Sequence, residues 1–151
     1  MIQIPRSALW LGIAGLTPFL WGAATQIAPS VTGLMPGFLG PLYIGPYIQV
    51  IYGQVILSFM SGVLWGFSAR AQGQTATVGY TLSVIPALWV FFATNGTPDT
   101  AAINLIFGFI GVLGLDWLFW QHQLAPKWWL KLRIILTLIV VTCLGVGLFY
   151  G

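Results

Sequence analysis

Five apolar runs of about twenty residues each follow one another along this chain and limit what it can fold into. A helix needs about 20 mainly apolar residues to cross the hydrocarbon core of a bilayer. Charged residues make up 5% of the 151 residues, against roughly 25% in soluble domains. The sequence therefore predicts an all-α integral membrane bundle of five transmembrane helices, forming a single domain over residues 1–151. The predicted spans are 7–26, 47–68, 78–94, 101–120 and 128–150.

The segments between the runs carry the residues that interrupt helices. Residues 28–46 hold four prolines and predict a long loop that lies at the interface or packs back on the bundle. A polar break at 69–77, a turn at 95–99 and a loop at 121–127 separate the remaining spans.

The basic residues fall on one side of the predicted bundle. With five alternating spans, the lysines and arginines share a side and Asp99 lies on the other. The positive-inside rule then predicts a cytoplasmic N-terminus and a periplasmic C-terminus in a bacterial cytoplasmic (inner) membrane. Because these basic residues form no continuous stripe, we expect lipid rather than nucleic acid as a partner. The basic residues are Arg6, Arg70, Lys127, Lys131 and Arg133.

Asp116 is the only acidic residue inside a predicted span. A charged side chain at the bilayer centre costs about 2.5–3.5 kcal/mol on insertion scales, so it needs a partner, a proton or water. Arg133 lies at a similar depth in the next span, which predicts an intramembrane Asp116–Arg133 pair. The alternative is a proton-relay or ligand-binding carboxylate that works with His122.

Two prolines, Pro18 and Pro86, fall near the middle of the first and third spans and predict kinks. Such kinks serve as packing devices in ordinary bundles, and in transporters they free carbonyl groups that line a binding site.

The second and fourth spans carry small and polar residues at helical spacing, which indicate faces that contact other helices. Gly62 and Gly66 form the four-residue spacing that lets two backbones approach closely, within the chain or with another subunit. The predicted contact residues are Gln54, Ser58, Gly62, Gly66, Gly108 and Gly111.

The chain lacks the residue sets on which most enzymes and metal proteins depend. One cysteine, Cys143, and one histidine, His122, cannot form a disulfide or close a metal site. We therefore expect no catalytic residues, no cofactor and no metal, and a protein that is not an enzyme.

Several segments together resemble a known family. They are 5–19 (PRSALWLGIAGLTPF), 52–66 (YGQVILSFMSGVLWG), 85–88 (IPAL), 108–116 and 125–133 (APKWWLKLR). The chain is similar to the uncharacterised membrane-protein family that includes mitochondrial transmembrane protein sixty-nine and proteobacterial members. One departure is Leu64, where the family often has histidine. The resemblance implies an inner-membrane location and no reaction, since the family is a domain of unknown function.

Three functions remain open from the sequence. The first is a non-enzymatic accessory or assembly subunit that packs against a larger membrane complex, respiratory or photosynthetic, or forms a homo-oligomer. The second is a small transporter or channel that uses Asp116. The third is a binder of a hydrophobic ligand such as a quinone or tetrapyrrole, held between aromatic residues such as Trp21, Trp65 and Trp89.

Overall fold

The computed structural model describes residues 3–150, and every regular element in that part of the chain is helical. The order is α1 (Arg6–Ala14), α2 (Thr17–Ile27), η1 (Pro29–Leu34), η2 (Pro41–Tyr43), α3 (Gly45–Ser68), α4 (Gly73–Ser83), α5 (Ile85–Ala93), α6 (Pro98–Gln121) and α7 (Trp129–Tyr150).

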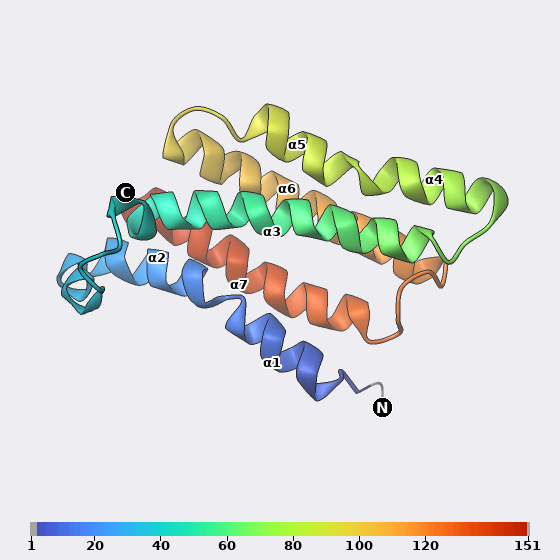
Figure 1. Cartoon of the computed structure of the whole chain (residues 1–151), viewed down its shortest axis with the longest axis horizontal. Coiled ribbons are helices and arrows are strands. Elements are labelled where there is room, and N and C mark those ends of the chain that lie inside the picture. The colour runs from blue at the N-terminus through green and yellow to red at the C-terminus, as the bar shows by residue number, and fades with distance from the viewer. Residues whose placement is uncertain (1–2, 151) are drawn as a thin grey trace.

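The helices group into five units that are long and apolar enough to cross a membrane. They run side by side along one axis, with α3 in the middle of the bundle (Figure 1). The predicted all-α bundle of five transmembrane helices is therefore confirmed. The units are Arg6–Ile27, Gly45–Ser68, Gly73–Ala93, Pro98–Gln121 and Trp129–Tyr150.

The first and third units are each broken just before a proline. The first breaks at Gly15 and Leu16, and Pro18 lies in the opening turn of α2. The third breaks at Val84, and Pro86 lies in the opening turn of α5. A proline there gives up no hydrogen bond, since its missing N–H belongs to the first turn.

Ser61 of α3 satisfies one amide at the second break. Its hydroxyl accepts a hydrogen bond of 2.8 Å from the backbone N–H of Ala87. The break in the third unit is thus tied to the central helix.

Two connecting segments differ from the sequence expectation. The third unit begins at Gly73 and not at Val78, because the glutamine and threonine residues of 74–77 extend α4 beyond its apolar part. The proline-rich segment 28–46 contains the two short 3-10 helices rather than a loop alone. Proline opens each of them, and its fixed φ suits a helical first turn.

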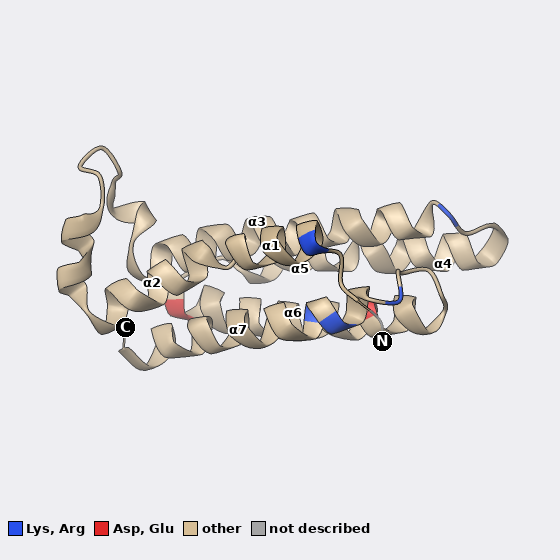
Figure 2. Ribbon diagram, turned by 90° about the horizontal axis from the view of Figure 1, so that it is seen from below, with Lys and Arg blue, Asp and Glu red and all other residues tan. Residues whose placement is uncertain are grey.

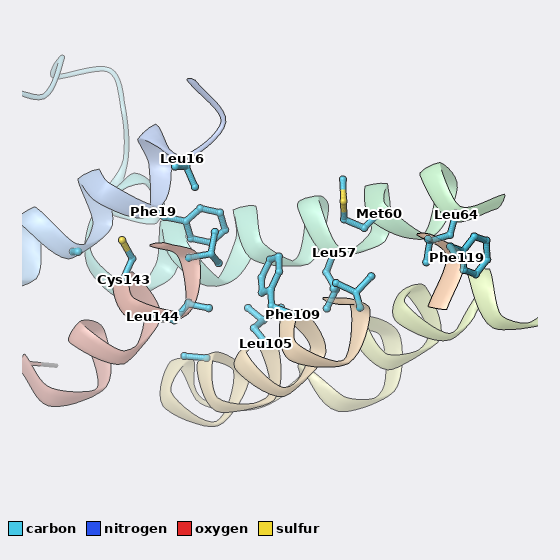
Figure 3. Packing of buried hydrophobic residues seen from close by; sticks show 14 of the residues in the cluster. Leu16, Phe19, Leu57, Met60, Leu64, Leu105, Phe109, Phe119, Cys143 and Leu144 are labelled. Carbon is cyan, nitrogen blue, oxygen red and sulfur yellow. The ribbon is translucent and has the colours of Figure 1, made fainter. Parts of the chain in front are cut away.

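The hydrophobic core lies where α3 contacts α2, α6 and α7. Phe19, Leu57, Leu105 and Phe109 are among the fully buried side chains that meet there (Figure 3). Many other large apolar side chains remain exposed, as expected for a surface that faces lipid.

Glycines allow the closest helix contacts. A Cβ at Gly108 of α6 would collide with Leu57 of α3 and press on Trp89 of α5. A Cβ at Gly53 of α3 would come within 2.9 Å of Leu105. Since interiors pack tightly, these positions fix the spacing of α3, α5 and α6.

Gln49 ties three helices together near the end of the bundle that carries the proline-rich segment. It is 1% exposed, and its Nε2 donates to the carbonyls of Phe19 (3.0 Å) and Cys143 (3.1 Å). Its Oε1 accepts from Gln26 Nε2 at 3.1 Å. Hydrogen bonds between helices of this kind hold membrane bundles where the hydrophobic effect is absent.

The charges are distributed unevenly along the bundle. Figure 2 shows the lysines and arginines in one half of its length. Asp99, in the first turn of α6, lies at the end where the chain passes from α5 to α6. This asymmetry matches the sequence pattern, while the side of the membrane on which each terminus lies stays a prediction.

Candidate ligand-binding site

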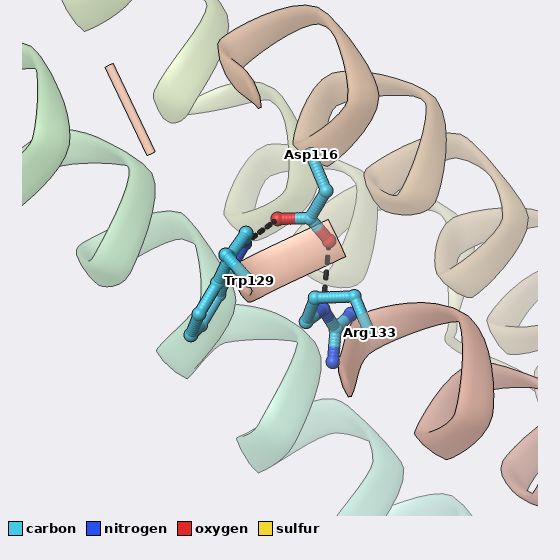
Figure 4. Close-up of polar contacts among 3 residues, drawn as sticks. All are labelled: Asp116, Trp129 and Arg133. Carbon is cyan, nitrogen blue, oxygen red and sulfur yellow. Dashed lines mark hydrogen bonds and ion pairs between the residues drawn. The ribbon is translucent and has the colours of Figure 1, made fainter. Parts of the chain in front are cut away.

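Asp116 of α6 and Arg133 of α7 form a buried ion pair. Arg133 Nε donates to Asp116 Oδ2 at 2.7 Å, and the two residues are 4% and 0% exposed (Figure 4). The short connection between α6 and α7 makes them antiparallel neighbours, which brings the two residues to the same depth.

Trp129 supplies a second donor to the carboxylate. Its indole Nε1 donates to Asp116 Oδ1 at 2.7 Å, so each carboxylate oxygen accepts a hydrogen bond (Figure 4). The sequence analysis did not identify Trp129 as a partner of Asp116. The spacing of Trp129 and Arg133 could have indicated it, because residues four apart share a helix face.

The pair leaves part of the guanidinium without a partner. Nε faces Asp116, and Figure 4 shows the remaining nitrogens of Arg133 pointing away from the carboxylate. Arg133 Nη2 is buried and has no hydrogen-bond partner among residues 3–150. A guanidinium has donors only, so this nitrogen needs an acceptor.

Thr137, one turn further along α7, also holds an unused polar atom. It is 3% exposed, and within the described part of the chain its Oγ1 has no partner. Other hydroxyls of this bundle donate to the carbonyl four residues earlier, as Thr94, Thr142 and Ser68 do. Thr137 therefore departs from the way in which these other hydroxyls are satisfied.

A cavity of about 400 Å³ has Arg133 and Thr137 among its lining residues, and we call it the Arg133 cavity. This volume lies in the range of small-molecule sites, roughly 300–1,000 Å³. Its walls come from both sides of the α1–α2 break and from α3, α6 and α7. The lining residues are Ala8, Leu11, Gly12, Gly15, Leu16, Phe19, Tyr52, Ile56, Phe59, Met60, Phe109, Trp128, Trp129, Leu132, Arg133, Leu136, Thr137 and Val140.

The cavity opens sideways between α1 and α3. Leu11 of α1 and Phe59 of α3 both line it and are 74% and 62% exposed. No residue of α1 is buried. A molecule dissolved in the bilayer could therefore enter between these two helices.

The break before Pro18 helps to shape the Arg133 cavity. Gly15 and Leu16 form the break, and both line the cavity. Because the chain changes direction there, α1 stands away from α3. The break before Pro86 borders a different hollow, of about 280 Å³, between α5 and α6.

His122 and Asp116 do not meet. His122 is exposed at the end of α6, and its Nδ1 lies 3.0 Å from the carbonyl of Leu118 in its own helix. The two hydrogen-bond partners of Asp116 are Arg133 and Trp129. The structure therefore does not bring together the relay considered from the sequence.

The predicted contact residues fall into two groups. Gln54 donates to the carbonyl and hydroxyl of Thr94 at 3.1 and 3.0 Å, and Gly108 is packed against α3 and α5. Ser58 is half-buried. In contrast, a Cβ at Gly62, Gly66 or Gly111 would meet nothing within 4 Å among the described residues.

The three tryptophans considered as a ligand cage lie apart. Trp21 Nε1 donates to the carbonyl of Tyr43 and Trp89 Nε1 to that of Asn104. Trp65 packs on Tyr80 with ring centres 4.5 Å apart. None of the three lines the Arg133 cavity, so the structure does not bring them together as one cage around it.

Comparison with known proteins gives a family match over nearly the whole chain. Residues 4–149 match the family described as "Protein of unknown function (DUF3429)". Transmembrane protein 69 of Xenopus tropicalis is 33% identical over 141 residues, covering 91% of this chain and 51% of that protein. Transmembrane protein 69 of Mus musculus is 27% identical over 143 residues, covering 92% and 54%. The chain thus spans about half the length of these curated relatives. No solved structure matches it.

Proposed function

We propose that this chain, a multi-pass membrane protein that belongs to the DUF3429 family of proteins of unknown function, binds a lipid-soluble molecule in the Arg133 cavity. The observation that carries the proposal is an apolar cavity lined by two buried residues, Arg133 and Thr137, that each hold a polar atom without a partner among residues 3–150.

A purely structural role accounts poorly for these two atoms. A buried donor without an acceptor costs about 1–3 kcal/mol, and lipid offers no water to replace the missing partner. The ion pair with Asp116 needs only Nε. A bound molecule with an acceptor would satisfy the remaining donors and leave its apolar part in the bilayer.

The proposed role is binding without catalysis, in the cytoplasmic membrane of a bacterium, with the N-terminus in the cytoplasm. The basic half of the bundle supports that orientation through the positive-inside rule. A reporter enzyme that is active only in the periplasm, fused to either terminus, tests it: activity from the N-terminal fusion would reverse the orientation.

The binding proposal is tested by filling the cavity. Leu136 lines it, whereas Leu138 on the same helix is 63% exposed. The protein is purified gently from its own membranes, and small molecules retained with it are identified by mass spectrometry. We expect a retained molecule that Leu136→Trp loses and Leu138→Trp keeps. Equal retention by both variants would contradict binding in this cavity.

A second candidate is the accessory subunit, favoured by the outer face of α3. Gly62 and Gly66 are exposed with open space at both positions, next to the exposed Phe59. Two exposed glycines four residues apart let a partner helix approach the backbone closely. That helix would belong to a respiratory or photosynthetic complex or to a second copy of this chain.

The accessory role is tested by pull-down with Gly62→Leu. The matched control is Gly114→Leu, at an exposed α6 position that is equally open. Loss of a partner with Gly62→Leu alone supports the role. If both variants keep the same partners, or the parent has none in mild detergent, the accessory role is rejected.

The transport alternative has less support. Both oxygens of Asp116 are engaged by Arg133 and Trp129, so a passing ion or proton would have to displace a donor. Flux that is abolished by Asp116→Asn, with the fold intact, would restore this alternative.

A further inference from the structure

The charge balance around the cavity restricts the kind of molecule that fits. Among residues 3–150, Arg133 is the only charged residue that lines it, and its charge is already balanced by Asp116 at 2.7 Å. An anionic headgroup would add an unbalanced negative charge to this site, and a cationic one would meet Arg133. Both are expensive in a medium of low dielectric constant. A neutral headgroup avoids both costs.

The hydrogen-bonding capacity restricts it further. Arg133 Nη2 only donates, and Thr137 Oγ1 can donate or accept. Both residues are at least 96% buried: their exposed fractions are 4% and 3%. The complementary group is an oxygen acceptor that carries no full charge. A carbonyl oxygen meets this requirement.

The shape of the wall favours a flat headgroup. Phe19 forms edge contacts with Tyr52 at 5.4 Å and with Phe109 at 6.0 Å between ring centres. All three residues are among those that line the cavity, where Tyr52 is half-buried and Phe19 and Phe109 are each 1% exposed. Aromatic walls stack on or edge against flat rings. The exposed rim at Leu11 and Phe59 leaves a path along which an apolar tail could extend into lipid.

From these three constraints, and resting on the proposed function, we propose that the Arg133 cavity binds a neutral, flat, carbonyl-bearing headgroup on an apolar body. The guanidinium of Arg133 and the hydroxyl of Thr137 donate to its carbonyl oxygens. Isoprenoid quinones and ketosteroids share this chemistry. A haem-type tetrapyrrole, whose carboxylates are anionic, does not.

The test compares neutral and anionic probes on the full chain in lipid nanodiscs. Decylubiquinone, progesterone and decanoate are titrated separately, and quenching or change of tryptophan fluorescence is followed, because Trp128 and Trp129 line the cavity. We expect saturable binding of decylubiquinone or progesterone that is at least tenfold tighter than that of decanoate. The preferred neutral probe distinguishes the quinone source from the steroid source.

Thr137→Val tests the hydrogen bond without disturbing the ion pair. We expect it to weaken binding of the neutral probe about fivefold, the effect of one hydrogen bond, and Thr137→Ser to restore it. The control is Thr142→Val, whose hydroxyl is exposed and bonded to the carbonyl of Leu138. Affinity unchanged by Thr137→Val would overturn the assignment of the headgroup.

The outcomes separate the two proposals. Tighter binding of decanoate, lost with Leu136→Trp, would overturn the neutral headgroup and keep the cavity as a binding site. If Leu136→Trp alters the binding of no probe and no retained molecule, the binding function itself fails.

Discussion

The ion pair between Asp116 and Arg133 makes a strong prediction about stability. Asp116→Asn keeps the size of the side chain and an oxygen that can accept from Trp129, but it removes the negative charge. Arg133, 4% exposed, would then carry an unbalanced charge inside the bundle. Breaking a buried pair by removing one partner costs about 3–5 kcal/mol.

The cost of Asp116→Asn should lie at the lower end of that range. The remaining amide oxygen still accepts a hydrogen bond, and a charged residue in a span costs about 2.5–3.5 kcal/mol on insertion scales. The expected loss is therefore about 3 kcal/mol in the free energy of unfolding. This corresponds to a change on the order of 100-fold in the equilibrium constant.

The assay is reversible unfolding in mixed detergent–lipid micelles, followed by tryptophan fluorescence. A double variant, Asp116→Leu with Arg133→Met, removes both charges and should recover most of the loss, because well-packed apolar residues often replace a buried pair at little cost. If the free energy of unfolding of Asp116→Asn lies within about 0.5 kcal/mol of that of the parent, the usual range for a surface substitution, the reasoning is refuted.

Three further predictions use the same unfolding assay. Gly108→Val should cost about 1–3 kcal/mol through overpacking, while Gly111→Val, which meets open space, should stay within about 0.5 kcal/mol; equal effects would contradict the packing account. Gln49→Leu should cost about 2 kcal/mol, since it removes hydrogen bonds that join α2, α3 and α7; a neutral result would show that these bonds add nothing. Ser61→Ala should cost about 1 kcal/mol by leaving the Ala87 amide without its acceptor, and an increase in stability would oppose this assignment.

Much of the fold follows from hydropathy and charge, because a span in lipid must be long, apolar and internally hydrogen-bonded. The five helical units could be predicted for this reason. The start of α4 at Gly73 could not, since polar residues at an interface extend a helix without changing the apolar signal.

The candidate site was only partly accessible from the sequence. Asp116 and Arg133 lie at similar depths in neighbouring predicted spans, and this was enough to suggest their contact. In the structure, Arg133 Nε lies 2.7 Å from Asp116 Oδ2. The cavity was not accessible, because it depends on how α1 stands away from α3 after the break at Gly15 and Leu16. The unused hydroxyl of Thr137 is likewise a property of packing, since most hydroxyls in a helix satisfy themselves locally.

The exposed glycines show a similar limit. The spacing of Gly62 and Gly66 indicates a close helix contact but not the partner. In the described chain, contacts of this kind are made by other glycines, such as Gly53 and Gly108. Sequence spacing alone does not separate a face that is used within the bundle from one that is turned toward lipid.

The most direct test of the central claim is an experimental density map of the protein purified with its native lipids. The account predicts density in the Arg133 cavity that ends in a group within hydrogen-bond distance of the Arg133 guanidinium and the Thr137 hydroxyl, with a tail leaving between α1 and α3. A map in which side chains close the cavity, or in which only an acyl chain passes without a polar group near Arg133, would contradict it.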